Sequence, residues 1–261
     1  MEKIKQALDK ARAERQQSGS RPLSSGVRGG GSPSTIQYTK TMSIEGSDIL
    51  MRENRLLSNT EHSEYADALK ILSTQVLQRM SENHWGSLAV TSTTKTEGKT
   101  TIAINLGISI SKEVDYTVLV VDANLRHPNM HEFFGIRPQY GLSDYLTSDI
   151  ELSDILINPK GIDHFVFLPA GKPTRSSSEL LRSPKMCSLV EELTTRYPKR
   201  IIIFDLPPVL DTADTIAFVP CVESVLVVVE DDITKEGDLK SAIEMLSVTN
   251  VIGTVLNKAV Y

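Results

Sequence analysis

The sequence predicts an α/β fold in which a mainly parallel sheet carries helices on both faces. Short runs rich in Val, Ile and Leu alternate with helical stretches from about residue 86 onward. Several of these runs are continuously apolar rather than alternating, which is typical of parallel strands that are buried on both faces. Strands that alternate with helices in this way are joined by right-handed crossovers in a doubly wound sheet.

The apolar runs and the helical periodicity locate the individual elements. In the helix expected over residues 61–80, apolar residues recur at three- and four-residue steps from Ala68 to Leu77 and form one stripe. The other helices lie between β-branched runs. The expected strands are residues 87–91, 116–121, 164–168, 200–204, 224–229 and 250–256, and the expected helices are 61–80, 99–112, 185–196 and 234–247.

The chain upstream of this alternation reads as an extension. Residues 1–16 are expected to form a short helix, residues 17–60 a flexible basic linker rich in Gly, Ser and Pro, and residues 61–261 the folded domain. Residues 1–40 hold eight Lys or Arg and three Asp or Glu, a balance of +5, and the total of −5 leaves −10 for the remainder. We therefore expect no nucleic-acid partner; the basic arm is either a solvated tail or a contact for an acidic partner or an anionic membrane surface.

Composition narrows the cellular setting. The longest apolar runs are about six residues, far below the ~20 needed to span a bilayer, and no apolar leader with a cleavage site is present. We expect a cytoplasmic protein, placed peripherally at the inner face of the plasma membrane. The two cysteines, Cys187 and Cys221, have no metal-ligand spacing and are expected to be buried as small apolar side chains.

The segment between residues 87 and 110 indicates a phosphate-binding loop. A buried strand runs into a polar loop, then into Gly98-Lys99-Thr100-Thr101 and a helix. Backbone N–H groups at a helix start face an anion, and Gly98 lets the main chain approach it closely. Lys99 can reach the outer phosphates, and Thr100 can bind Mg²⁺ through its hydroxyl. Position 93 is Thr instead of the usual Gly, so an ordinary strand–helix turn is the alternative.

Two aspartates follow buried strands. Asp122 ends the run TVLVVD, and Asp205 ends RIIIFD before a Pro-Pro turn. Carboxylates at the C-terminal ends of parallel strands lie where open α/β sheets bind ligands. Beside a phosphate loop they hold the Mg²⁺ ion and its water. Taken singly, each could be a helix cap or a turn residue.

A weaker signal follows the last expected strand. Asn257 and Lys258 reach the same edge of the sheet, where the Asn257 amide could read a nucleotide base. A simple turn at the strand end is an equally good interpretation.

In this order, the motifs resemble bacterial tyrosine kinases of the capsular and exopolysaccharide export systems. The resemblance covers about residues 62–257 and includes EGKTTIAINL, TVLVVDANLRHP, GLSDYL, LPAGKP, SSELLRS, IFDLPP and IGTVLNK. It implies a P-loop NTPase fold with a deviant Walker loop, of the same superclass as the partitioning and septum-placing ATPases. It also implies ATP and Mg²⁺ as ligands and autophosphorylation on tail tyrosines, for which Tyr261 is the candidate here.

The resemblance also assigns residue roles. Lys99, Asp122 and Asp205 would be catalytic, with Lys99 on the β- and γ-phosphates and Asp122 as base for the attacking tyrosine. Thr100, Asp122 and Asp205 would hold the metal. The nucleotide-binding set would be Thr96, Glu97, Gly98, Lys99, Thr100, Thr101, Arg126 and Asn257.

Some positions depart from the family pattern. Lys95-Thr96 replaces a Pro-Gly pair, Asn124 replaces an acid, and the ring-forming helix motif appears as Asp67, Lys70 and Ser73, without its last arginine. The expected function is an ATP-dependent tyrosine autokinase that regulates exopolysaccharide polymerisation and export. Its expected partners are a separate membrane-embedded activator and a second copy of the chain. The alternatives are a non-kinase ATPase switch and a nucleotide-binding regulatory module without catalysis.

Overall fold

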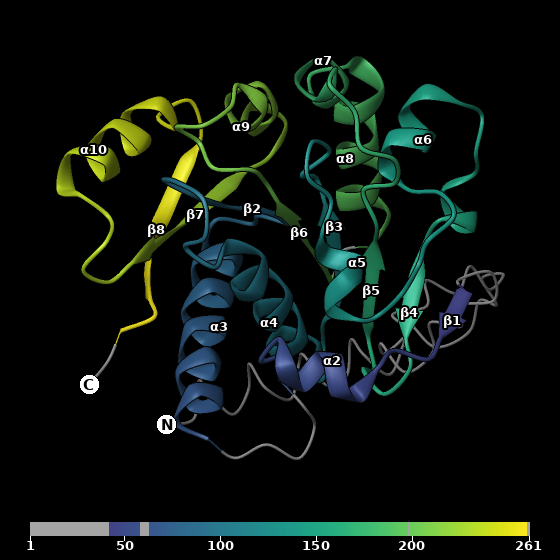
Figure 1. Ribbon diagram of the computed structural model, residues 1–261, viewed down its shortest axis with the longest axis horizontal. Helices are drawn as coiled ribbons and strands as arrows, with labels where there is room; N and C mark the ends of the chain where they lie inside the picture. Colours follow the sequence, from purple (N-terminus) through teal and green to yellow (C-terminus); the bar gives the residue numbers. More distant parts are fainter. Residues whose placement is uncertain (1–41, 58–62, 198, 260–261) are drawn as a thin grey trace, which may run out of the picture. The chain divides into compact units, whose positions relative to one another are not determined.

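A mixed sheet of eight strands organises the computed structural model, which describes residues 42–57, 63–197 and 199–259. The strand order is β1-β4-β5-β3-β6-β2-β7-β8 (Figure 1). All neighbouring strands pair in parallel except β4 and β5, which are antiparallel. The sheet confirms the predicted α/β class with a mainly parallel sheet. All of these strands belong to one compact unit, Pro33–Tyr261.

The strands and helices expected from residue 61 onward all appear, within a few residues of their predicted ends. The strands are β1 Met42–Ile44, β2 Ser87–Ser92, β3 Thr117–Asp122, β4 Ile157–Pro159, β5 Phe165–Leu168, β6 Arg200–Asp205, β7 Ser224–Glu230 and β8 Asn250–Asn257. The helices are α2 Asp48–Glu53, α3 Glu64–Glu82, α4 Lys99–Ser111, α5 Met130–Phe133, α6 Leu142–Thr147, α7 Ser177–Leu181, α8 Pro184–Arg196, α9 Asp214–Phe218 and α10 Glu236–Met245, with short 3₁₀ turns η2 Leu152–Asp154 and η3 Val219–Cys221.

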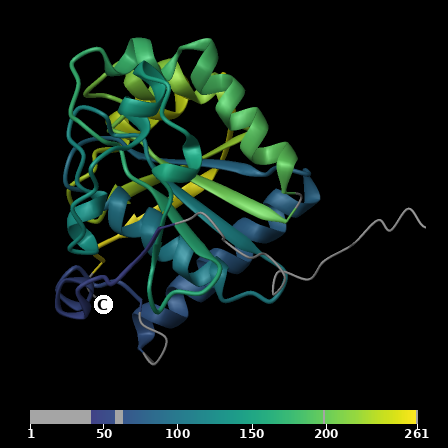
Figure 2. The ribbon, with the colours of Figure 1, turned by 90° about the vertical axis from the view of Figure 1, so that its right-hand side faces the viewer.

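Both faces of the central strands are buried, as the continuous apolar runs predict. Successive residues of a strand point to opposite faces. Along β6, Ile201 and Ile203 therefore join one core, and Ile202 and Phe204 join the other. The turned view in Figure 2 shows the strands between the two helical layers. Burial on both sides explains why no polar residue interrupts these runs.

Helices α3 and α4 cover the first face and lie side by side (Figure 1). Helix α3 begins at the N-cap Ser63, whose hydroxyl accepts a hydrogen bond from the Ala66 N–H. Helix α4 is buried almost all round because α3 packs on one side and the sheet on the other. Gly107 allows this close packing, since a β-carbon there would overlap the Val120 side chain.

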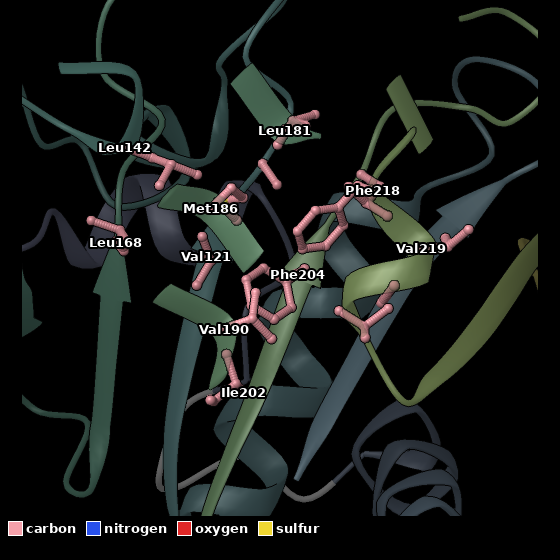
Figure 3. Packing of buried hydrophobic residues seen from close by; sticks show 14 of the residues in the cluster. Val121, Leu142, Leu168, Leu181, Met186, Val190, Ile202, Phe204, Phe218 and Val219 are labelled. Atoms are coloured by element: carbon pink, nitrogen blue, oxygen red, sulfur yellow. The ribbon is translucent and has the colours of Figure 1, made fainter. Parts of the chain in front are cut away.

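Helices α6 to α10 cover the second face. Ser183 caps α8, and Pro184 occupies the first turn, where its missing N–H costs no helical hydrogen bond. The ring of Phe204 from β6 packs against that of Phe218 from α9, with centroids 4.9 Å apart (Figure 3). This core therefore fixes the strand that carries Asp205 against the helix that begins at Asp214.

The predicted linker is wrong over residues 42–57. Residues 42–57 include a strand and a helix, and Leu56 and Leu57 are buried. The Asn105 side chain of α4 accepts from the Leu57 N–H and donates to the Arg55 carbonyl, each at 2.8–2.9 Å. Two apolar residues and one buried amide therefore dock this segment. The expected helix over 1–16 and the linker residues before 42 lie outside the described residues.

The prediction for the two cysteines is also wrong. Cys187 of α8 and Cys221 of η3 are half-buried and paired as a disulfide, with Cα atoms 5.3 Å apart. The fold brings together positions 34 residues apart in sequence. Sequence spacing alone gave no sign of this contact.

Within the described ranges, no helix combines the length and the apolar character needed to cross a bilayer.

Candidate functional site

The predicted phosphate loop lies between the end of β2 and the start of α4. Gly98 is the N-cap of α4 and has a left-handed backbone, φ 88°. A β-carbon at Gly98 would overlap the side-chain nitrogen of Asn257. Backbone strain and close packing therefore both require glycine here. The half-buried Lys99 and the buried Thr100 begin the helix, and the half-buried Thr101 follows them.

Glu97 stabilises the loop from inside instead of facing a ligand. Its carboxylate is 1% exposed and accepts hydrogen bonds from the hydroxyls of Thr93 and Thr234 and from the Thr94 N–H. A buried carboxylate is stable only when such donors surround it. Its predicted nucleotide-binding role therefore does not fit its side chain, whose acceptors are used within the protein. Sequence reasoning missed Thr234, which precedes α10.

The end of β8 braces the same loop. The Asn257 amide donates to the Glu97 carbonyl at 2.8 Å, and the Lys258 ammonium donates to the Thr96 carbonyl at 2.7 Å. Lys258 also pairs with Glu230 at 2.9 Å. Asn257 therefore reaches the predicted edge of the sheet, but its amide holds the loop. Thr96, exposed and at φ 69°, contributes its main chain to this contact.

Lys99, Thr100 and Asp205 form the centre of the site. The Thr100 hydroxyl donates to Asp205 Oδ2 at 2.7 Å, and Lys99 Nζ lies 3.9 Å from Asp205 Oδ1. Asp205 is fully buried at the end of β6. Burial raises the pKa of Asp205, while Lys99 and the Thr100 hydrogen bond oppose the rise.

Asp122 lies beside Asp205 on the neighbouring strand. The two aspartates are register partners in the parallel pairing of β3 and β6. Asp122 is also fully buried and accepts from the Asn124 and Met130 N–H groups. Burial first, and then the Asp205 charge, raise the pKa of Asp122 to about 7. The sheet thus holds two carboxylates together at the edge where the loop begins.

The donor set around Asp205 fits a divalent cation bound together with a phosphate. Asp205 Oδ1 is buried and has no hydrogen-bond partner among the described residues, and the Thr100 hydroxyl lies beside the same carboxylate. In that part of the chain, no cluster of three or more His, Cys, Asp or Glu could hold a metal alone. Mg²⁺ commonly takes only one or two protein carboxylates and completes its shell with water and substrate phosphate.

Arg126 is held by a residue that sequence reasoning missed. Its Nε lies 3.1 Å from Asp214 Oδ2, and its Nε and Nη2 each lie 3.3 Å from Oδ1. Asp214 is fully buried and also accepts from the Ser177 hydroxyl at 2.7 Å. One carboxylate therefore joins the loop after β3 to α7 and α9. Asp214 is visible in the sequence as an acidic residue nine positions after Asp205, but this spacing does not indicate that it pairs with Arg126.

Replacing Asp122 with Asn should reduce the pH dependence of stability. The pKa of Asp122 is about 7 in the folded chain, against an ordinary value of 3.8. Between these two pH values the folded chain therefore binds a proton that the unfolded chain has lost. The stability that this proton contributes is fully present below pH ~3.8 and is lost as the pH rises to about 7. Relative to wild type, Asp122→Asn should gain up to about 4 kcal/mol in the free energy of unfolding across this interval. Urea denaturation of the nucleotide-free protein in EDTA measures the gain.

Asp205 and Lys99 are the charged groups that face Asp122, and both are retained in Asp122→Asn. Asp149→Asn, at an exposed position, controls for the loss of one carboxylate elsewhere. If the difference in the free energy of unfolding between wild type and Asp122→Asn stays constant across this pH range, the raised pKa of Asp122 is contradicted.

Asn257→Ala distinguishes a loop brace from a base reader. If the Asn257 side chain only holds the loop, its loss should lower the affinities for ATP and for GTP by the same factor, about five-fold for one lost hydrogen bond. Asn250→Ala is the matched control, because Asn250 donates to the Glu223 carbonyl at the opposite end of β8. Calorimetric titration of both nucleotides gives the factors. A loss confined to ATP would restore the base-reading role.

Sequence comparison relates the chain to tyrosine-protein kinases. A Staphylococcus aureus protein named tyrosine-protein kinase CapB is 25% identical over 198 residues, which cover 75% of this chain and 85% of CapB. The tyrosine-protein kinase Etk of Escherichia coli K12 is 28% identical over 193 residues, which cover 73% of this chain and 26% of Etk. The chain thus corresponds to most of the first relative and to about a quarter of the second.

Solved structures share the fold. The crystal structure of the chimerical protein CapA2B2 matches with a TM-score of 0.72 at 24% identity, over 84% of this chain and 94% of that one. Cobyrinic acid a,c-diamide synthase of Mycobacterium smegmatis, solved with a bound ATP analogue and magnesium, matches with a TM-score of 0.54 at 20% identity, over 65% and 71%. Both likenesses support the predicted P-loop architecture.

The family match covers the site itself. The CobQ/CobB/MinD/ParA nucleotide-binding domain matches residues 88–260, more than half of the 261 residues. This range includes the phosphate loop and both strand-end aspartates. The chain therefore belongs to the CobQ/CobB/MinD/ParA family of nucleotide-binding domains.

Proposed function

We propose that this chain is an ATP-dependent protein tyrosine kinase that phosphorylates itself and regulates exopolysaccharide polymerisation and export. One observation carries the proposal: Lys99, Thr100 and Asp205 meet at the phosphate loop, with Asp122 beside Asp205 on the next strand. The names of the relatives CapB and Etk supply the reaction class. Phosphoryl transfer needs mainly positioning and neutralisation of charge, which these residues can provide.

Each residue has a defined task in this proposal. Lys99 and the N–H groups at the start of α4 bind the outer phosphates of ATP. Thr100 and Asp205 would hold Mg²⁺, and the bound ion would supply positive charge to the phosphate oxygens. Asp122 accepts the proton of the attacking tyrosine hydroxyl as its oxygen bonds to the γ-phosphorus and ADP leaves. A pKa of about 7 suits a general base at neutral pH.

The partners are part of the same proposal. We assign a separate membrane-embedded activator on the resemblance to export-system kinases, and the net charge of +5 in residues 1–40 would favour docking at an anionic surface. Self-association through α3 has less support. Ser73, which replaces an arginine of the ring-forming motif, is buried and shares a hydrogen bond with Ser109 of α4 at 2.9 Å. This position therefore presents no charge to a second copy.

A kinase assay tests the proposal directly. The protein is incubated with Mg²⁺-ATP, with and without a cytoplasmic fragment of the export system's membrane protein, and analysed by intact mass and phosphopeptide mapping. We expect one added phosphate on Tyr261, none in Tyr261→Phe, and none in Lys99→Ala because its phosphate ligand is gone. Unmodified wild-type protein under both conditions would contradict kinase activity.

A non-kinase ATPase switch is the second candidate. Its motivation is Asn124, which lies where the family has an acid and whose side-chain carbonyl accepts a long hydrogen bond from the His127 N–H at 3.4 Å. This amide serves the turn after β3 and adds no charge to the site. Release of ADP without phosphotyrosine in the same assay would favour the switch. ATP binding without turnover would instead favour a regulatory module.

A further inference from the structure

The disulfide between Cys187 and Cys221 joins two elements that pack mainly on other neighbours. Helix α8, which carries Cys187, packs on β6 and α7, while η3, which carries Cys221, packs on α9. The two cysteines are 34 positions apart, and the loop that the bond closes contains the whole of β6 and α9. The bond therefore tethers the segment of chain that carries Asp205.

Both cysteines lie where solvent reaches the surface of the fold. Each is half-buried, and exposed residues lie beside them in the chain: Lys185 and Ser188 near Cys187, and Pro220 next to Cys221. A thiolate opens a disulfide by attacking one of its sulfurs, so exposed disulfides are the labile and regulatory ones. In the cytoplasm, where we expect this chain from its sequence, disulfides are usually transient and redox-sensing.

The fold also positions the two thiols to form the bond again. The Cα atoms lie 5.3 Å apart, within the range of about 4.4–6.8 Å that a disulfide spans. Buried neighbours of both cysteines belong to the same hydrophobic core, namely Met186 and Leu189 of α8 and Phe218 and Val219 beside η3. This packing keeps the two thiols close after reduction. The sequence contains no third cysteine, so neither thiol has a competing partner within the chain.

The tether acts on the helix that holds Arg126. Asp214, the first residue of α9, accepts hydrogen bonds from the Arg126 guanidinium and from the Ser177 hydroxyl. Helix α9 continues directly into η3, which ends at Cys221. With the bond closed, α9 and η3 cannot move away from the sheet without α8. With the bond open, they can open locally as a smaller unit, which lowers the free energy of that opening.

We propose that Cys187 and Cys221 form a reversible thiol–disulfide switch that controls the local opening of α9 and η3. Two molecules of glutathione open the bond: the first forms a mixed disulfide with one cysteine, and the second attacks that mixed disulfide. The products are two protein thiols and one oxidised glutathione, which has given up two electrons and two protons. Oxidised glutathione reverses the reaction. The inference is independent of the kinase proposal, because it involves neither nucleotide nor phosphoryl transfer.

Thiol counting tests whether the bond is reversible. The protein is equilibrated without oxygen in mixtures that run from an excess of oxidised to an excess of reduced glutathione, then alkylated with N-ethylmaleimide and analysed by intact mass. We expect two alkylated thiols to appear together as reduced glutathione increases, and to disappear when the protein is returned to oxidised glutathione. A bond that stays closed in the largest excess of reduced glutathione, or that does not form again, overturns the proposal.

Hydrogen exchange and thermal unfolding measure what the switch does. In the reduced protein the amides of α9 and η3 should exchange about ten-fold faster or more, and the unfolding temperature should fall by roughly 10 °C. Cys187→Ala and Cys221→Ser should match the reduced wild type in either glutathione mixture. Ser188→Ala, at the exposed position beside Cys187, is the matched control and should respond as wild type does. Equal exchange of α9 in oxidised and reduced wild type overturns the proposal.

Discussion

The hydrogen bond between the Thr100 hydroxyl and the Asp205 carboxylate is the contact on which the site depends. It joins the first turn of α4 to the end of β6. The Lys99 ammonium lies 3.9 Å from the other oxygen of the same carboxylate. Asp122 adds a second buried carboxylate on the neighbouring strand. Two such groups side by side are costly unless protons or cations compensate them. The demand for positive charge at this edge is therefore a property of the fold.

The loop that faces this charge pair is held by side chains from the far end of the chain. Glu97 is surrounded by hydroxyl and N–H donors, and Asn257 and Lys258 bind the carbonyls of Glu97 and Thr96. These contacts hold the loop in shape although Lys95-Thr96 replaces the Pro-Gly pair that the resemblance to export-system kinases would lead one to expect. The end of β8 is thus structurally part of the phosphate loop.

The central strands and the meeting of the main residues of the candidate site could be predicted from the sequence for a simple physical reason. Continuous apolar runs locate strands that are buried on both faces, and a parallel sheet brings their C-terminal ends to one edge. Asp122, Asp205 and Lys99 could therefore be placed together without any knowledge of side-chain contacts. The structure confirms that proximity, while the roles assigned to these residues remain proposals.

What the sequence could not predict depends on long-range side-chain pairing. Glu97 was predicted to bind nucleotide because it lies in the loop, but its carboxylate accepts a hydrogen bond from Thr234, 137 residues away in the sequence. Asp214 holds Arg126, and Cys187 meets Cys221, through contacts that leave no local pattern. The short strands β1 and β4 carry only three residues each, too few to show a period.

The most direct test of the account is the effect of Mg²⁺ on ATP affinity in wild type and in Asp205→Asn. Calorimetric titrations with Mg²⁺ and with EDTA give two affinities for each protein, and their ratio isolates the contribution of the metal. If Asp205 and Thr100 hold the cation beside the phosphates, Mg²⁺ will strengthen binding to wild type and leave the variant nearly unchanged. An equal strengthening in both proteins would show that the metal binds elsewhere and would contradict the central claim.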